Sequence, residues 1–333
     1  MLGLGRLNKT VFALAVAGVF ALTPVVAAAQ AAKKPTTTTR TAAARARAAA
    51  QARAAAAARL VREAETPKFK TDILGNLVPD VRAAAAIVFN PQTNEVLWEA
   101  NSHDRRPIAS LTKLMTALTF IADEPDMNRK VTVVRADTRA ASVTYLRTGD
   151  VVTLRDVLHL TLIASDNAAA RVLARTSEGG SSAFIRRMNE TALQLGLTSA
   201  RFTDPSGLHA DNVASAYDIS HLISYASAND TLAPIMRKSS HEVRTNRRVV
   251  TVRSTLNKLF GTGVDVVGGK TGFISKAGYC LATLLQIPHG SQVAVVVLGA
   301  SNSTLRFAEV RHLFNWVVGR TNGLDGGDET IDR

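Results

Sequence analysis

The chain has 333 residues, 46% of them hydrophobic, which is enough to bury a sizeable core in one large domain or two small ones. Its formal net charge is +13, but ten Lys and Arg residues lie within residues 30–70, where the acidic residues are Glu63 and Glu65. Residues 71–333 are nearly balanced in charge, which argues against nucleic acid as a partner. A single cysteine, Cys280, excludes an intramolecular disulfide, and we expect it to be a small buried residue in a strand.

Residues 1–29 have the pattern of a secretory signal. Arg6 and Lys9 give a basic start, and an almost wholly apolar run precedes the alanines at 27–29, which suit cleavage by a signal peptidase. We therefore predict export to the periplasm or cell envelope, with cleavage after Ala29. Retention of the apolar run as a membrane anchor is the alternative, although the run is short for that purpose.

Residues 30–70 are low in complexity and rich in Ala, Arg, Lys and Thr. Alanine favours helix, so residues 41–65 are compatible with partial helix, but they lack an apolar stripe for packing. We predict a disordered linker over 30–70, ahead of a folded domain at 71–318. The basic charge suggests electrostatic contact with a membrane or an acidic wall polymer, and a plain spacer is the simpler alternative.

The folded domain is predicted in the order hairpin, helices, strands and helix. Turn residues at 90–94 separate strands at 84–89 and 95–99, and helices follow at 110–121, 157–163, 182–195 and 216–226. Strands at 249–253, 279–287 and 292–298 precede an amphipathic helix at 305–318. This order favours an α+β fold in which terminal helices cover an antiparallel sheet and a helical subdomain, about 114–240, is inserted. Residues 319–333 are polar and glycine-rich, and we predict a disordered tail.

Ser110 and Lys113 are the first candidates for chemistry. They lie three residues apart just after Pro107, so a helix that begins here places the alcohol and the amine on one face. A serine hydroxyl needs a base to become a nucleophile, and a lysine is such a base when burial or nearby positive charge disfavours its ammonium form. Alone, the pair is explained more simply as a helix cap and a surface lysine.

Two downstream tripeptides give the pair its meaning. Ser165-Asp166-Asn167 begins 55 residues after Ser110, and Lys270-Thr271-Gly272 begins 105 residues later again. S-x-x-K, S-D-N and K-T-G occur in this order in penicillin-binding proteins and class A β-lactamases. Each tripeptide alone carries little information, but all three in order with domain-sized gaps are specific.

The flanking sequences narrow the resemblance. Residues 106–117, 202–208 and 268–281 resemble the serine D-alanyl-D-alanine carboxypeptidase and endopeptidase family, the low-molecular-mass penicillin-binding proteins of peptidase family S11. Within it, the chain is most similar to the penicillin-binding protein 7 type of D,D-endopeptidase, and the resemblance covers about residues 82–318. It implies a β-lactamase/transpeptidase-like fold and a penicillin-sensitive serine D,D-peptidase that acts on peptidoglycan stem peptides through an acyl-enzyme.

The resemblance also assigns a task to each motif residue. The expected catalytic residues are Ser110 as nucleophile, Lys113 as general base, Ser165 as proton relay, and Asn167. Substrate binding is expected from Lys270, Thr271 and Gly272, and an oxyanion hole from the backbone N–H groups of Ser110 and Phe273. We also expect the charge of Lys270 to lower the pKa of Lys113, and β-lactams to acylate Ser110.

Several alternatives stay open. No cofactor or metal is expected, because the seven histidines show no metal-ligand spacing and no phosphate-binding loop is present. A class A β-lactamase needs a Glu to activate the deacylating water, whereas residues 199–205 contain none and Asp204 there is expected to be structural. The short chain after Lys270 favours an endopeptidase that cuts D-alanyl cross-links. A D-alanyl-D-alanine carboxypeptidase is the first alternative, then a β-lactamase, then a non-catalytic peptidoglycan-binding protein.

Overall fold

The computed structural model describes residues 37–325 apart from residue 289, and the chain divides into two compact units, residues 1–54 and 55–333. The predicted signal at 1–29 lies outside the described residues. Helix α1 (Thr37–Glu65) begins in the first unit and ends in the second. The prediction of a disordered linker is wrong over this helix, because the high helix propensity of alanine outweighs the missing apolar stripe.

The other helices lie in the second unit. They are η1 (Ala109–Leu111), a 3₁₀ turn, α2 (Thr112–Ala122), α3 (Arg135–Thr138), α4 (Leu154–Ile163), α5 (Asn167–Thr176), α6 (Gly180–Gln194), α7 (Ala216–Ala228), α8 (Leu232–Met236) and α9 (Ser303–Asp325). Among the described residues, no helix has both the length and the apolar character that a bilayer crossing requires.

The strands are β1 (Phe69–Thr71), β2 (Leu77–Pro79), β3 (Ala85–Asn90), β4 (Glu95–Ala100), β5 (Arg106–Pro107), β6 (Lys130–Thr132), β7 (Val151–Thr153), β8 (Val213–Ala214), β9 (Ser240–Arg244), β10 (Val249–Arg253), β11 (Asp265–Ile274), β12 (Gly278–Gln286) and β13 (Gln292–Ala300). Five of them form an antiparallel sheet in the order β11-β12-β13-β3-β4. The remaining strands described pair as short two-stranded ribbons.

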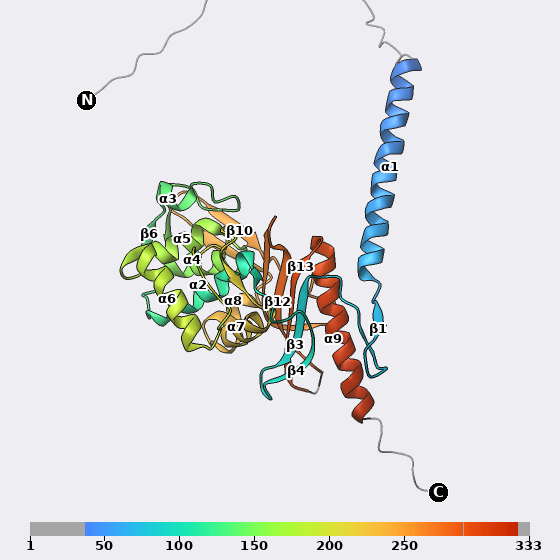
Figure 1. Cartoon of the computed structure of the whole chain (residues 1–333). Coiled ribbons are helices and arrows are strands. Elements are labelled where there is room, and N and C mark those ends of the chain that lie inside the picture. The colour runs from blue at the N-terminus through green and yellow to red at the C-terminus, as the bar shows by residue number, and fades with distance from the viewer. Residues whose placement is uncertain (1–36, 289, 326–333) are drawn as a thin grey trace, which may run out of the picture. The chain divides into compact units, whose positions relative to one another are not determined.

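Helices cover both faces of this sheet. Helix α9 lies on one face, and α7 with the rest of the helical layer lies on the other (Figure 1). The residues of β13 alternate between these layers: Val293, Val295 and Val297 join the cluster on the α9 side, and Ala294, Val296 and Leu298 join the cluster on the α7 side. Because both faces are covered, the central strands read as nearly continuous apolar runs.

The predicted α+β arrangement is confirmed, with helices α2–α8 inserted between β4 and β11. Several elements were not predicted from the residue pattern, among them α5, α8 and β9. Strand β11 contains Gly268, Gly269 and Gly272, which hide the apolar alternation typical of a strand. Cys280 is fully buried in β12, as expected. Helix α9 extends to Asp325, so the tail predicted from 319 is corrected to begin no earlier than 326, where the described residues end.

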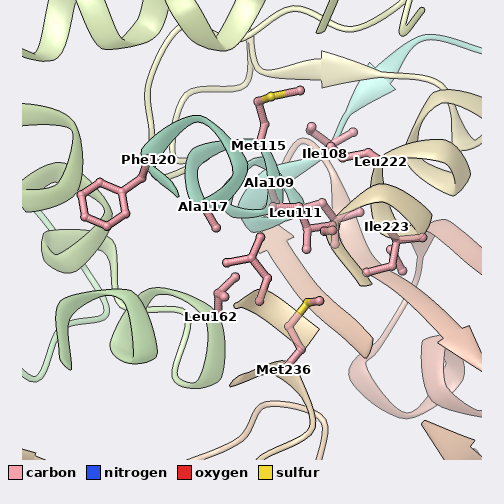
Figure 2. Close-up of a cluster of buried hydrophobic side chains, with 14 of the residues drawn as sticks. Ile108, Ala109, Leu111, Met115, Ala117, Phe120, Leu162, Leu222, Ile223 and Met236 are labelled. Atoms are coloured by element: carbon pink, nitrogen blue, oxygen red, sulfur yellow. The ribbon is translucent and has the colours of Figure 1, made fainter. Parts of the chain in front are cut away.

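Helix α2 lies at the centre of the inserted helical layer. Most of its side chains are buried, including those of Lys113 and three threonines. Figure 2 shows the cluster around it, with labelled side chains from η1 and the residue before it and from α2, α4, α7 and α8: Ile108, Ala109, Leu111, Met115, Ala117, Phe120, Leu162, Leu222, Ile223 and Met236. A polar side chain on this helix is therefore held away from water.

We predict that the buried carboxylate of Glu309, on α9, is important for stability. Its oxygens accept hydrogen bonds from the backbone N–H groups of Arg82, at 2.6 Å, and Ala83, at 3.2 Å, just before β3. Glu309→Ala leaves both donors without an acceptor and should lower the free energy of unfolding by about 3 kcal/mol, measured by denaturant titration. Glu309→Gln keeps one acceptor oxygen and should lose less.

The exposed Glu190, which lies 3.6 Å from Arg186, provides the control. Glu190→Ala should change the free energy of unfolding by less than about 0.5 kcal/mol. A Glu309→Ala variant as stable as this control would contradict the assigned role.

Candidate active site

The three sequence motifs meet in one cleft of about 210 Å³ beside strand β11. Its lining includes Ser110, Ser165, Asn167, Thr271, Gly272 and Phe273, together with Ser142, Val143, Ala164, Leu208, Thr255 and Arg306. Lys113 and Lys270 have no exposed surface. Strand β11 is at the edge of the five-stranded sheet, so this side of the strand has no neighbouring strand.

The backbone around Ser110 is tightly constrained. The preceding residue, Ala109, has a φ of 49°, which costs roughly 1 kcal/mol for a residue with a Cβ. Gly207, with a φ of 81°, packs so closely that a Cβ would lie 2.0 Å from the Ala109 carbonyl oxygen. A Cβ on Gly272 would lie 2.9 Å from the Ile108 carbonyl oxygen. Gly207 and Gly272 thus allow two different segments of the chain to pack closely against the η1 turn.

The Lys113 amine makes three contacts in the interior. Nζ donates to Ser110 Oγ at 2.9 Å, to Asn167 Oδ1 at 2.7 Å and to the Ser206 carbonyl oxygen at 2.6 Å. The last two partners are acceptors only. When Lys113 is neutral, its two N–H bonds satisfy them, and its lone pair then faces Ser110, the one partner with a proton to give. The geometry therefore aims the base at the nucleophile.

Burial lowers the pKa of Lys113 to about 7. The carboxylates of Asp166 and Asp204 oppose this shift, and the charge of Arg171 adds to it. The expectation that Lys270 is the cause needs revision, because desolvation in the packed interior is the larger effect. Burial and the charges of Lys113 and Arg306 in turn hold the pKa of Lys270 well below its usual range.

Ser165 and Lys270 form a second pair in the cleft. The Lys270 amine donates to Ser165 Oγ at 2.7 Å and to the Thr271 carbonyl oxygen at 2.9 Å. Ser165 has a φ of 58°, in the left-handed region, between the end of α4 and the start of α5. The predicted relay residue thus has the lysine of the third motif as its hydrogen-bond partner, while the lysine of the first motif contacts Ser110.

Asn167 is the first residue of α5, and its side chain is fixed at both ends. Nδ2 donates to the Ala141 carbonyl oxygen at 2.6 Å and to Ser142 Oγ at 3.2 Å. A carbonyl oxygen only accepts, so this contact fixes which end of the amide is the oxygen, and that oxygen faces Lys113. Asp166 caps α5 by accepting from the Ala169 N–H at 2.9 Å.

Asp204 organises the loop on the other side of Lys113. Its carboxylate accepts from the N–H groups of Ser206, Gly207 and His209 and from the Asn212 side chain. Burial alone would raise the pKa of Asp204, but these hydrogen bonds together lower it. The structural role expected for Asp204 is confirmed, because its oxygens are engaged in shaping the loop that presents the Ser206 carbonyl.

The sequence analysis missed Arg306, which reaches the cleft from α9. Nη1 donates to the carbonyl oxygens of Gly272 at 2.9 Å and Cys280 at 3.2 Å, while the buried Nε has no partner. Burial lowers its pKa to about 10, so it remains a cation at neutral pH. In the sequence, Arg306 is a single arginine beside the apolar stripe of the last helix. An arginine in that position is equally compatible with an exposed side chain, and only the fold shows that it contacts the backbone of β11.

The fold and these contacts define a serine acyl-transfer site, with a serine beside a buried lysine of lowered pKa. A sequence profile of the D-alanyl-D-alanine carboxypeptidase family, peptidase family S11, matches residues 74–302. The chain therefore belongs to this family, and it is a serine-type D,D-peptidase. The resemblance seen in the sequence is confirmed.

Individual relatives agree with this assignment. A D-alanyl-D-alanine endopeptidase of Escherichia coli is 30% identical over 244 residues, covering 72% of this chain and 78% of that protein. A D-alanyl-D-alanine carboxypeptidase of Bacillus subtilis is 31% identical over 268 residues, covering 75% and 66% of the two chains.

Solved structures confirm the expected fold. The Streptomyces K15 DD-transpeptidase has a TM-score of 0.66 at 26% identity, covering 72% of this chain and 97% of that one. Penicillin-binding protein D2 of Listeria monocytogenes, in its cefotaxime-bound form, has a TM-score of 0.63 at 30% identity, covering 72% and 98%. The α+β architecture of this chain is the DD-transpeptidase fold.

The pKa of Lys113 predicts a pH dependence. Only the neutral amine accepts a proton, so acylation of Ser110 should rise with pH through about 7 and level off above it. The measurement is the second-order rate of acylation by a fluorescent penicillin across this range. Asp166→Asn removes a carboxylate that favours the ammonium form, so the midpoint should move to lower pH. A rate that falls with pH would contradict the assignment of Lys113 as the base.

Proposed function

We propose that this chain is a penicillin-sensitive D,D-endopeptidase that cuts D-alanyl cross-links between peptidoglycan stem peptides. The observation that carries the acyl-enzyme step is the 2.9 Å contact between Ser110 Oγ, which lines the cleft, and the fully buried Lys113 amine. Transfer of the Ser110 proton to Lys113 generates the nucleophile, which attacks the carbonyl carbon of a D-Ala residue. The amine of the second stem peptide leaves with a proton, and water then releases the acyl group.

The other predicted residues complete this sequence. Ser165 hands a proton toward the leaving amine, and its contact with Lys270 orients its hydroxyl. The backbone N–H groups of Ser110 and Phe273 stabilise the oxyanion, and the close packing of Gly272 against the η1 turn supports this assignment. The free edge of β11, including Thr271, pairs with the extended substrate by strand addition.

The endopeptidase assignment is supported by the relatives named D-alanyl-D-alanine endopeptidase, at 30–32% identity. A carboxypeptidase is the second candidate, because relatives with that name reach similar identity. The cationic guanidinium of Arg306 beside the cleft also suits the terminal carboxylate of a D-alanyl-D-alanine stem peptide. Comparing cross-linked and monomeric peptides as substrates distinguishes these two activities.

Two measurements test the proposed function. Incubation with benzylpenicillin should add the intact mass of the drug to the protein, at a peptide that contains Ser110, and Ser110→Ala should show no addition. Purified cross-linked muropeptides should be converted to monomers faster than a monomeric pentapeptide releases D-Ala. Release of D-Ala with no cleavage of cross-links would instead support the carboxypeptidase, and fast drug turnover without an adduct would support a β-lactamase.

We further propose that residues 1–29 direct export to the periplasm, and that helix α1 binds an anionic wall polymer. Arg47, Arg53 and Arg59 are exposed, so this helix offers several positive charges to an anionic partner. Binding to a soluble polyanion or to anionic lipid distinguishes a wall polymer from a membrane.

Replacement of these three arginines by glutamine tests that contact. Near an anionic surface each arginine contributes about 1 kcal/mol, so the affinity for a soluble polyanion such as dextran sulfate should fall about 100-fold at low salt. Arg186→Gln, an exposed change on α6, is the control and should leave the affinity unchanged. Equal loss in both variants, or binding to anionic lipid vesicles but not to the polyanion, would overturn the proposal.

A further inference from the structure

The turn between β9 and β10 is fastened to a distant loop. In this turn, residues 245–248, the Arg248 guanidinium donates to the Tyr145 carbonyl oxygen at 2.6 Å and to Asp150 Oδ1 at 3.1 Å. Asp150 has no exposed surface, and Arg248 also lies 3.1 Å from its other oxygen. Asn246 adds two contacts, because its side chain accepts from the Val151 N–H at 2.8 Å and its own N–H donates to the Val151 carbonyl.

The loop held in this way, residues 139–150, forms a wall of the cleft. Its residues Ser142 and Val143 line the cleft, and Ser142 has a φ of 48°, which a residue with a Cβ adopts only under constraint. The loop also lacks regular structure, apart from turns and bends. Its shape must therefore come from the contacts at its ends and along its length.

The same loop supplies the partners of the second motif. The Val143 carbonyl accepts from the Asn167 N–H at 2.9 Å, and the Ala141 carbonyl and Ser142 Oγ hold the Asn167 side chain. The Tyr145 N–H and Thr144 hydroxyl donate to Asp166. Hydrogen bonds at Tyr145 and at residues 141–143, joined by the backbone of the loop, thus connect the guanidinium of Arg248 to the side chain of Asn167.

We propose that Arg248 and Asp150 are positioning residues: they hold the 139–150 loop so that the side-chain oxygen of Asn167 keeps its contact with the Lys113 amine. This inference rests on the proposed acylation chemistry at Ser110 and adds a requirement outside the cleft. Arginine suits the task because its planar fork contacts a carboxylate and a carbonyl at once. Without the guanidinium, the loop loses its contacts at Tyr145 and Asp150, and the acceptors that orient the Asn167 side chain are no longer held in place.

Lys113 should sense this loss directly. Its pKa is low mainly because water is excluded, so a loosened loop wall should raise the pKa toward that of an exposed lysine. The charged groups that act on Lys113 or contact it through space, namely Asp166, Asp204, Arg171 and Lys270, are all unchanged by substitution at 248. A shift in the pH midpoint would therefore report solvent access, whereas a purely structural role would lower thermal stability and leave the midpoint in place.

The test is the rate and pH profile of acylation by a fluorescent penicillin. Arg248→Gln should slow acylation about 10- to 100-fold, the range expected for a misplaced catalytic group, and should move the midpoint to higher pH. Arg248→Lys keeps the charge opposite Asp150 and should recover part of the rate. Arg244→Gln, on the same hairpin, removes an exposed arginine paired with Glu242 and should match the wild type.

A double substitution identifies the route of the effect. In an Asn167→Ala background, Arg248→Gln should slow acylation by less than about 3-fold, because the residue through which it acts is already absent. Full additivity would overturn the proposal, as would an Arg248→Gln rate equal to that of Arg244→Gln. Asp150→Asn, nearly equal in shape, serves if Arg248→Gln does not fold. A wild type that is not acylated would refute the proposed function itself, whereas an acylated wild type with equally fast variants would refute only the positioning role.

Discussion

The burial of Lys113 is the constraint on which the rest of the site depends. An ammonium group in the interior is unfavourable, so the fold must either pair it with a carboxylate or let it lose its proton. Here the direct partners of the amine are a hydroxyl, an amide oxygen and a backbone carbonyl. Because none carries a full charge, the neutral form is accessible near pH 7, and the amine becomes a base.

A neutral buried amine needs walls that keep water away from it and hold its three polar partners in place. Helix α2 provides one wall through its buried apolar surroundings, and the loop organised by Asp204 provides another. Gly207 and Gly272 then bring backbone against the η1 turn more closely than any residue with a side chain allows. The packing that stabilises the fold around Lys113 is therefore the same packing that keeps its amine dry.

The sequence predicted the chemistry of this protein better than its local structure. Ser110, Lys113 and Asn167 were identified because their motifs keep a fixed order and spacing, and the structure brings them together. The apolar pattern alone does not indicate the full length of strand β11, because Gly268, Gly269 and Gly272 interrupt the alternation. Arg306 and Arg248 were missed for a different reason. A single arginine has no local pattern, and its partners are distant in sequence.

The order of strands in the sheet has a consequence for how the molecule is made. Strand β3, near the beginning of the folded unit, pairs with β13, near its end, and α9 then covers them both. The contacts that close the sheet thus join residues that are far apart in the sequence, and such contacts form slowly. A ribosome that has not yet released the last helix holds a chain without a complete core and without Arg306 in the cleft. A half-made chain therefore has an incomplete cleft.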